Sequence, residues 1–263
     1  MTERPSVLPL MSLPPDEVHV WITEPERITD PRLLEAYLAL LDRAERERHQ
    51  RFHFEKHRRQ YLVSHALVRL CLSRYAAVPP EAWSFVTNDH GCPRIAGEGS
   101  PRLRFNLSHT DGMAICAVTS EADVGVDVED AMRPGETVGI ADRFFAPAEV
   151  AALRGLPVEK QRERFFEYWT LKEAYIKARG MGLSLPLEHF AFELQAGQSP
   201  RISFDARLRD DPETWRFRQW RPSERHQAAL AVRRPSDLSL QVRCQRTVPL
   251  SGDEPPEFIV ATY

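Results

Sequence analysis

The stretch Gly125-Val126-Asp127-Val128-Glu129 lies near the middle of a chain of 263 residues. Its β-branched valines alternate with the other residues, and this period of two predicts a strand. Such a strand points Asp127 and Glu129 to the same face, roughly 7 Å apart. Like charges so placed repel each other unless a cation, typically a hard divalent ion, lies between them. The stretch therefore predicts either a metal site or an edge strand whose polar face lies in water.

A second stretch follows about forty residues later, Trp169-Thr170-Leu171-Lys172-Glu173-Ala174-Tyr175-Ile176-Lys177. It belongs to a predicted helix from about Gln161 to Arg179, which Gly180 ends as a C′ residue. Glu173 and Lys177 are four residues apart, so they face the same side of the helix. They form either an ordinary surface ion pair, worth a few tenths of a kcal/mol, or part of a site.

Two features favour a site on this helix. Phe166 and Trp169 share a stripe roughly 80° wide with Glu173 and Lys177, which predicts partial burial, and a buried ion pair is retained only when something compensates its cost. The chain has 35 basic residues, but only four are lysines, and two of these stand in this helix. In an arginine-rich chain a lysine suggests a compact, mobile charge, as at a phosphate.

Composition limits the classes of protein to consider. A hydrophobic content of 42% and a charged content of 28% are typical of a soluble globular chain, as one large domain or two of about 130 residues. The net charge of −3 gives no general attraction to nucleic acid or an anionic membrane. No run approaches the roughly twenty apolar residues of a membrane helix, and the proline-rich N-terminus does not resemble a signal peptide, so we expect a cytoplasmic protein. The four cysteines are scattered and predict reduced thiols.

The pattern of elements is similar in the two halves of the chain. The first half predicts a strand at 18–22, helices at 31–41 and 61–75, and strands at 83–87, 102–105 and 113–119. The second predicts a strand at 124–129, helices at 140–145, 147–153 and 161–179, and strands at 190–194, 201–204, 215–220 and 227–232. We therefore expect an α+β protein of two similar halves with the site in the seam between them.

The segments between these elements complete the prediction. Residues 43–59 are dense in charge of both signs, which indicates a solvated helical face or an anion site. Residues 106–112 are predicted to be a loop, and the adjacent Ser108 and His109 lack the GxSxG elbow of a hydrolase. We expect an N-terminal half at 1–120, a C-terminal half at 121–237, and an appended extension at 238–263, with possible late strands at 238–248 and 258–260.

Four motifs occur in an order and at spacings that together resemble a known family. They are Asn106-Leu107-Ser108-His109, Gly125-Val126-Asp127-Val128-Glu129, Phe144-Phe145, and Trp169-x-x-Lys172-Glu173-x-x-x-Lys177 followed by Gly180-x-Gly182-Leu183. The family is that of the phosphopantetheinyl transferases, in the larger, monomeric type that activates surfactin synthetase. The likeness spans roughly residues 51–232.

The resemblance implies two pseudo-symmetric α+β halves that form a pseudo-dimer with the active site at their interface. It implies transfer of 4′-phosphopantetheine from coenzyme A to a serine of an apo acyl or peptidyl carrier protein, with Mg²⁺ and release of 3′,5′-ADP. By position, Asp127, Glu129 and Glu173 match the metal-binding acids, and Glu173 also matches the residue thought to take the serine proton. Lys177 matches a lysine at the pyrophosphate, and Ser108 and His109 match coenzyme A contacts.

The chain departs from the family at three positions. Cys92 stands where the turn at Gly91-x-Pro93 usually carries a lysine, and Glu45 and Gln60 occupy places near the usual basic residues. We therefore expect the nucleotide to be held by Arg48, Arg59 or Arg94. Two rivals stay open: another metal-dependent phosphoryl or phosphodiester enzyme, and an inactive relative that only binds carrier proteins, although the three acids and Lys177 are all present.

Overall fold

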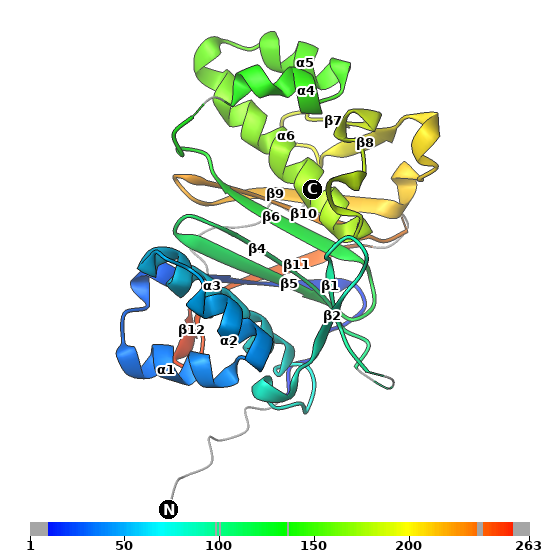
Figure 1. The fold of residues 1–263 in the computed structure, drawn as a ribbon. Helices are drawn as coiled ribbons and strands as arrows, with labels where there is room; N and C mark the ends of the chain where they lie inside the picture. Colours follow the sequence, from blue (N-terminus) through cyan, green and yellow to red (C-terminus); the bar gives the residue numbers. More distant parts are fainter. Residues whose placement is uncertain (1–9, 98, 100, 136, 236–238, 255–263) are drawn as a thin grey trace, which may run out of the picture.

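The computed structural model describes residues 10–97, 99, 101–135, 137–235 and 239–254 as two sheets between layers of helices (Figure 1). The larger sheet has the order β12 (Gly252–Glu254), β11 (Gln241–Val248), β1 (Glu17–Thr23), β5 (Met113–Thr119) and β4 (Arg104–Thr110). The smaller has the order β6 (Val124–Asp130), β10 (His226–Arg233) and β9 (Trp215–Ser223).

Helices and short hairpins cover the outer faces of the two sheets. On the larger sheet lie α1 (Pro31–Leu40), α2 (Arg43–Gln50), α3 (Glu55–Leu72) and the hairpin of β2 (Phe85–Thr87) with β3 (Pro93–Ile95). On the smaller lie α4 (Ala141–Phe144), α5 (Pro147–Arg154), α6 (Val158–Arg179) and the hairpin of β7 (Phe190–Glu193) with β8 (Arg201–Phe204). Within the described part of the chain, no helix is long and apolar enough to cross a bilayer.

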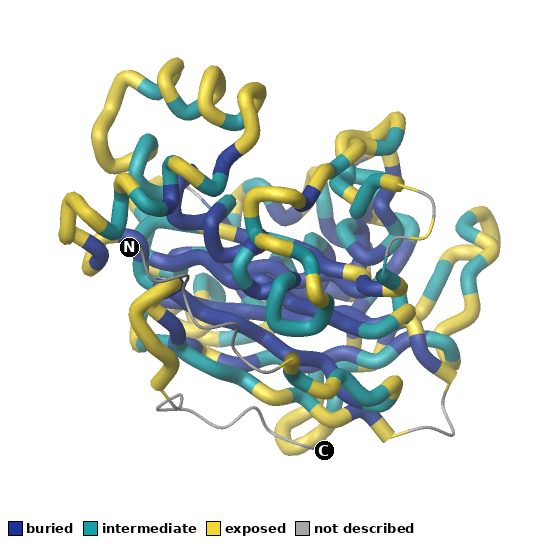
Figure 2. The backbone as a smooth tube through the Cα atoms, turned by 90° about the horizontal axis from the view of Figure 1, so that it is seen from below, coloured by how far each residue is buried: buried dark blue, intermediate teal, exposed yellow. Residues whose placement is uncertain are grey.

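The two halves repeat one topology. In each, a strand is followed by a long helix, a short hairpin and an antiparallel strand pair, giving the sheet orders β1-β5-β4 and β6-β10-β9. This confirms the predicted α+β architecture of two similar halves. Apolar side chains of both sheets, including Val20, Ile115, Val126 and Leu230, form a core between them. Figure 2 shows the central strands buried and the connections around them exposed.

The halves meet where the edge strands β4 and β6 lie side by side (Figure 1). Alternate side chains of β4 accept hydrogen bonds from backbone N–H groups of β6. The pairs are Asn106 Oδ1 with Val126 N at 2.9 Å, Ser108 Oγ with Val128 N at 3.3 Å, and Thr110 Oγ1 with Asp130 N at 3.3 Å. The predicted loop at 106–112 is therefore wrong for 106–110. Its polar residues look like a turn because they bond to β6 across the seam.

The C-terminal segment is part of the larger sheet. β11 pairs in parallel with β1, from Glu17 with Gln241 to Ile22 with Arg246, so the described part of this segment is no appendage. The sequence pattern of this segment was weak because β11 is only partly buried, and its buried and exposed residues do not alternate regularly. The second possible late strand, at 258–260, lies outside the described residues. The four cysteines are free thiols, as predicted.

Gly125 allows α6 to lie directly on β6. A Cβ atom at this position would be 2.0 Å from the carbonyl oxygen of Ala174 and 2.4 Å from the backbone nitrogen of Ala178. Both are backbone atoms of α6, so no side-chain movement could relieve the clash. The absence of a side chain at Gly125 brings the helix close enough for its polar residues to reach Asp127 and Glu129 on the same strand.

Candidate active site

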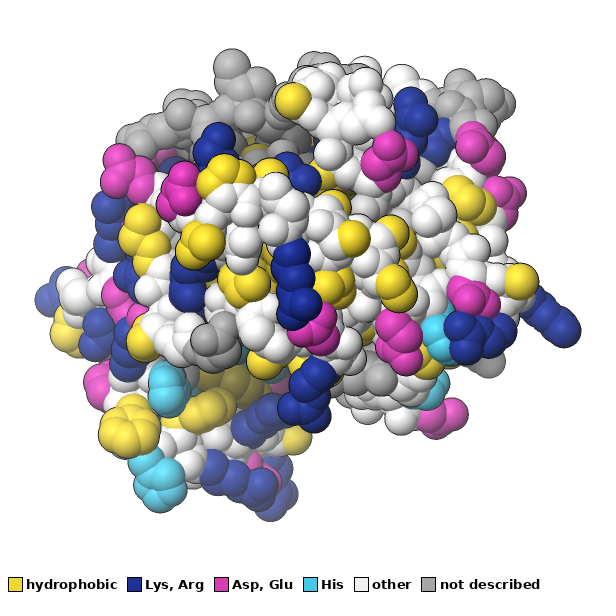
Figure 3. All heavy atoms as spheres, turned by 90° about the horizontal axis from the view of Figure 1, so that it is seen from above, with side chains coloured by type: hydrophobic (Ala, Val, Ile, Leu, Met, Phe, Trp, Pro, Cys, Tyr) yellow, Lys and Arg dark blue, Asp and Glu magenta, His cyan; other side chains and the backbone are white. Residues whose placement is uncertain are grey.

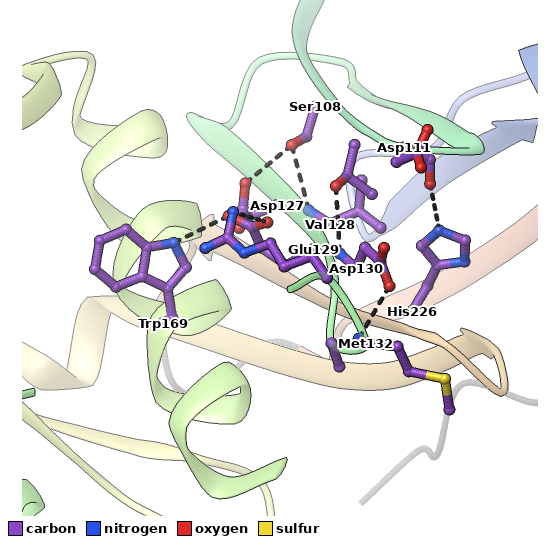
Figure 4. Close-up of polar contacts among 12 residues, drawn as sticks. Ser108, Asp111, Asp127, Val128, Glu129, Asp130, Met132, Trp169 and His226 are labelled. Atoms are coloured by element: carbon purple, nitrogen blue, oxygen red, sulfur yellow. Dashed lines mark hydrogen bonds and ion pairs between the residues drawn. The ribbon is translucent and has the colours of Figure 1, made fainter. Parts of the chain in front are cut away.

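The two motif stretches meet in one cavity of about 380 Å³ at the seam. β4 contributes Ser108 and His109, β6 contributes Asp127 and Glu129, and α6 contributes Trp169, Glu173 and Lys177. Figure 4 shows Ser108 and Trp169 on either side of the two β6 carboxylates. Because strand and helix carry the predicted acids into the same cavity, the structure brings together the residues that the sequence assigned to one site.

Asp127 is the most deeply enclosed of these acids, with 4% of its surface exposed. Its Oδ1 atom accepts hydrogen bonds from Lys177 Nζ at 2.6 Å and from Ser108 Oγ at 2.9 Å. Its Oδ2 atom is buried and has no hydrogen-bond partner among the described residues. One carboxylate oxygen is therefore held in place, while the other is left uncompensated.

The two glutamates resist ionisation in this environment. Burial, followed by the charge of Asp127, raises the pKa of Glu129 to about 7 and that of Glu173 also to about 7. Glu129 accepts a hydrogen bond from Trp169 Nε1 at 3.1 Å and pairs with Arg133 at 3.2 Å. A group with a pKa close to the working pH can exchange a proton readily, as general acid–base catalysis requires.

The two helix lysines have different surroundings. Lys177 lies at the cavity and also donates to Ser108 Oγ at 2.9 Å. Lys172 is fully buried, pairs with Glu149 at 2.7 Å, and donates to the carbonyl oxygens of Leu187 and Phe190. The idea that a rare lysine marks a phosphate is therefore wrong for Lys172, which ties α6 to the segments around it.

The acids fit a hard divalent cation by their chemistry. Three carboxylates surround one cavity, and the buried Oδ2 of Asp127 lacks a partner among the described residues. Burial, followed by the charge of Asp127, raises the pKa of both glutamates, so a bound cation would stabilise their charged forms. Among the described residues, no three His, Cys, Asp or Glu side chains are already gathered around one point. The Lys177 ammonium lies against one oxygen of Asp127.

The predicted nucleotide residues lie in different places. Arg94 and Cys92 line a cleft that continues to Lys177. Partial desolvation, then the charge of Lys177, lowers the pKa of His109, and Arg48 contributes in the same direction. Arg59 forms its ion pair with Glu55 at 3.6 Å, and no described hydrogen bond or ion pair joins it to the cavity.

The sequence did not reveal the partners of several residues around the site. Gln60 donates to the carbonyl oxygen of Thr110 and lies 3.3 Å from His109 Nδ1. Glu45 pairs with Arg69 at 2.6 Å and with His65 at 2.8 Å, which explains an acid at that point of the chain. Glu149 is the buried counter-ion of Lys172. A helical-period analysis places Glu45 and Glu149 on helices but does not reveal such distant partners.

Both halves of the chain match known family models. Residues 123–232 match the family model described as 4′-phosphopantetheinyl transferase superfamily, and residues 29–121 match 4′-phosphopantetheinyl transferase, N-terminal. The 4′-phosphopantetheinyl transferase HetI of Nostoc sp. is 35% identical over 231 residues, covering 85% of this chain and 91% of that protein. A 4′-phosphopantetheinyl transferase of Bacillus subtilis is 31% identical over 198 residues, covering 75% and 84%.

Two more distant proteins extend the comparison. The human L-aminoadipate-semialdehyde dehydrogenase-phosphopantetheinyl transferase is 27% identical over 229 residues, covering 81% of this chain and 72% of that protein. Among solved structures, the holo-[acyl-carrier-protein] synthase of Thermotoga maritima is 23% identical and covers 43% of this chain and 63% of that one, with a TM-score of 0.35.

Proposed function

The chain belongs to the 4′-phosphopantetheinyl transferase superfamily, and we propose that the cavity at its seam is where 4′-phosphopantetheine passes from coenzyme A to a carrier-protein serine. The serine oxygen attacks the phosphorus of the pantetheine phosphate, the bond to the second phosphate breaks, and 3′,5′-ADP leaves. The observation that carries this assignment is the meeting of Asp127, Glu129, Glu173 and Lys177 in one cavity.

Asp127, Glu129 and Glu173 would hold Mg²⁺, the cation expected for this reaction. When bound, such an ion neutralises the diphosphate and favours departure of the nucleotide. The unpartnered Oδ2 of Asp127 supports this role, as does the hydrogen bond from Trp169 that fixes one oxygen of Glu129. Ser108 orients Asp127 from the other side, at 2.9 Å.

Glu173 is the proposed general base. Its carboxylate lines the cavity beside Asp127 and Lys177, where it can take the proton of the serine hydroxyl. Lys177, 27% exposed at its side chain, is placed to offset the charge that develops on the departing 3′,5′-ADP. Phosphoryl-type transfer asks mainly for such neutralisation and positioning, because the protein contributes little covalent chemistry.

We further propose that Ser108, His109 and Lys177 contact coenzyme A, together with Arg48, Arg59 or Arg94. Arg94 has the best support, because it lines a cleft that also reaches Lys177. Arg48 is supported by its electrostatic influence on His109. Arg59 has the least support, because its ion pair is with Glu55 outside the cavity. The protein is proposed to act as a cytoplasmic monomer on acyl or peptidyl carrier proteins.

Mass spectrometry of carrier proteins tests the function. Apo acyl and peptidyl carriers are incubated with the protein and coenzyme A, with Mg²⁺ or with a chelator. We expect the mass of at least one carrier to rise by one phosphopantetheine group, only with Mg²⁺ and only when its acceptor serine is intact. Cleavage of coenzyme A at an equal rate without any carrier would support a phosphodiesterase instead. Carrier binding without a mass change would support an inactive relative.

A further inference from the structure

Arg218 is a buried cation that the proposed reaction does not use. It lies on β9 with 7% of its surface exposed. Its Nη1 atom donates to the backbone oxygen of Phe217 at 2.8 Å and to Ser199 Oγ at 3.2 Å. Its Nε atom is buried and has no hydrogen-bond partner among the described residues. The guanidinium therefore has hydrogen-bonding capacity that the described protein atoms leave unused.

Two other buried cations among the described residues have a carboxylate partner, whereas Arg234, 9% exposed, has none and donates to the carbonyl oxygen of Pro15. Arg69 pairs with Glu45 at 2.6 Å, and Lys172 pairs with Glu149 at 2.7 Å. No described carboxylate forms an ion pair with Arg218, and its pKa is lowered by burial and then by the charge of Arg216. A buried charge without a counter-ion is costly, because neither water nor an opposite charge compensates it.

The guanidinium lies between two cavities at the edge of the smaller sheet. One, of about 330 Å³, is also lined by Gln195, Gln198 and Gln219. The other, of about 680 Å³, is also lined by Arg201 and Arg216. Figure 3 shows basic and acidic side chains interspersed over the face seen from above, which gives no single-sign surface field there. What distinguishes this place is one enclosed cation with further basic and amide groups around it.

The acids nearest to these cavities do not compensate Arg218. Glu167 lines the smaller cavity and pairs with Arg164 at 2.7 Å. Glu213 lines the larger one and is exposed. Neither forms an ion pair with Arg218 in the described structure. An incoming anion would therefore meet a cation that no described carboxylate neutralises.

We propose that Arg218, with Ser199 and Arg216, forms a second binding site that takes a small oxyanion, a carboxylate or phosphate group. Arginine suits this ligand because its planar fork can donate two parallel hydrogen bonds to such an anion. The Ser199 hydroxyl accepts from Arg218 and keeps its own hydrogen free to donate to the ligand.

This site is separate from the catalytic cavity. β10 lies between β6 and β9, so Arg218 is two strand spacings, about 10 Å, from β6. Asp127 pairs with Ala229, and Ala229 pairs with Gln219, so these three residues share one face of the sheet. Arg218 is next to Gln219 and belongs to the opposite face. The two sites can therefore be perturbed independently.

Thermal unfolding with added anions tests the proposal. Wild type, Arg218→Met and the matched control Arg221→Met are melted in sodium phosphate, sodium acetate and sodium chloride at equal ionic strength. Arg221 lies on the same strand but is half-exposed and pairs with Glu163. We expect phosphate or acetate to raise the Tm of wild type and Arg221→Met above the chloride value. At an anion concentration of ten times Kd, the folding equilibrium should shift about elevenfold toward the folded state.

Arg218→Met should lose this anion response and melt in chloride at or above the wild-type temperature, because an uncompensated buried charge has been removed. A response to phosphate alone identifies a phosphate site, and a response to acetate a carboxylate site. The same titrations with Lys177→Met remove the contribution of Lys177 to anion binding in the catalytic cavity and should keep the response that depends on Arg218.

Two results would overturn the proposal. One is an equal anion response in wild type and Arg218→Met. The other is the absence of any anion response in wild type. Adventitious binding would raise the Tm of all variants alike.

Discussion

Replacing Gly125 by alanine should disturb the packing of α6 on β6 and thereby lower the activity. The new Cβ would lie 2.0 Å from Ala174 O and 2.4 Å from Ala178 N, whereas ordinary contacts begin at 3.4 Å. Helix α6 would have to retreat from β6 by more than about 1 Å, since both obstacles are backbone atoms. Lys177 Nζ, now 2.6 Å from Asp127 Oδ1, would move out of hydrogen-bond range, and Glu173 would move with the same helix.

The expected cost has two parts. Overpacking of this kind destabilises a protein by about 3 kcal/mol or more, which corresponds to a fall in Tm of roughly 6–12 °C for a chain of this size. Displacing catalytic groups by about 1 Å can lower turnover by roughly a hundredfold. The assays are a melting curve and the rate of holo-carrier formation, measured at a temperature where the variant is folded.

Gly252→Ala is the matched control. A Cβ at Gly252, in β12, would meet no heavy atom within 4 Å, so its stability should stay within about 0.5 kcal/mol of wild type and its activity should be unchanged. A Gly125→Ala protein that melts and turns over like wild type would refute the close approach of α6 to β6 as the basis of the site.

Three further changes test other parts of the structure. Glu45 has a pKa of about 2, below its ordinary value, because hydrogen bonds from His65, Asp42 and Arg69 outweigh the effect of burial. The ionised Glu45 therefore contributes to the free energy of unfolding above pH 4.5, and this contribution is lost as the pH falls toward 2. Glu45→Gln should therefore lower the free energy of unfolding at pH 7 by up to about 3 kcal/mol and flatten its decline below pH 4.5, measured by urea unfolding. Glu149→Gln should destabilise by about 3–5 kcal/mol in the same assay, because it leaves Lys172 buried without a counter-ion, and adding Lys172→Met should recover part of the loss; equal stability of single and double variants would contradict this. Cys92→Lys adds a charge to the cleft lined by Arg94 and Lys177, and should tighten coenzyme A binding a few-fold at low salt but not at high salt; a lower Tm with no gain in calorimetric affinity would exclude a nucleotide contact there.

Local pattern was sufficient to predict the strand and helix of the site. β6 is buried on both faces yet still alternates valine with glycine and acids, and α6 shows a regular stripe that includes Trp169 and Glu173. Both patterns arise from the nearest neighbours along the chain, so period alone places Asp127 and Glu129 on one face of the strand, and Glu173 and Lys177 on one face of the helix. The prediction that the site lies in the seam between the halves was based on the repeated order of elements.

Long-range contacts explain what the sequence did not reveal. Residues 106–110 look like a turn because Asn106 and Ser108 bond to backbone groups twenty residues away. Lys172 and Lys177 are equally rare by composition, but about 140° separates them around the helix axis, so one is buried on Glu149 while the other reaches the cavity. The pairing of β11 with β1 joins segments from opposite ends of the chain.

We propose that the carboxylates at the seam carry out the transfer, with Glu173 as the base. The most direct measurement is the initial rate of holo-carrier formation by wild type and Glu173→Gln, at saturating coenzyme A and Mg²⁺, with matching melting curves. The substitution keeps the size of the side chain but removes its charge and basicity, so turnover should fall more than about a hundredfold. A folded Glu173→Gln protein with turnover within a few-fold of wild type would contradict the claim.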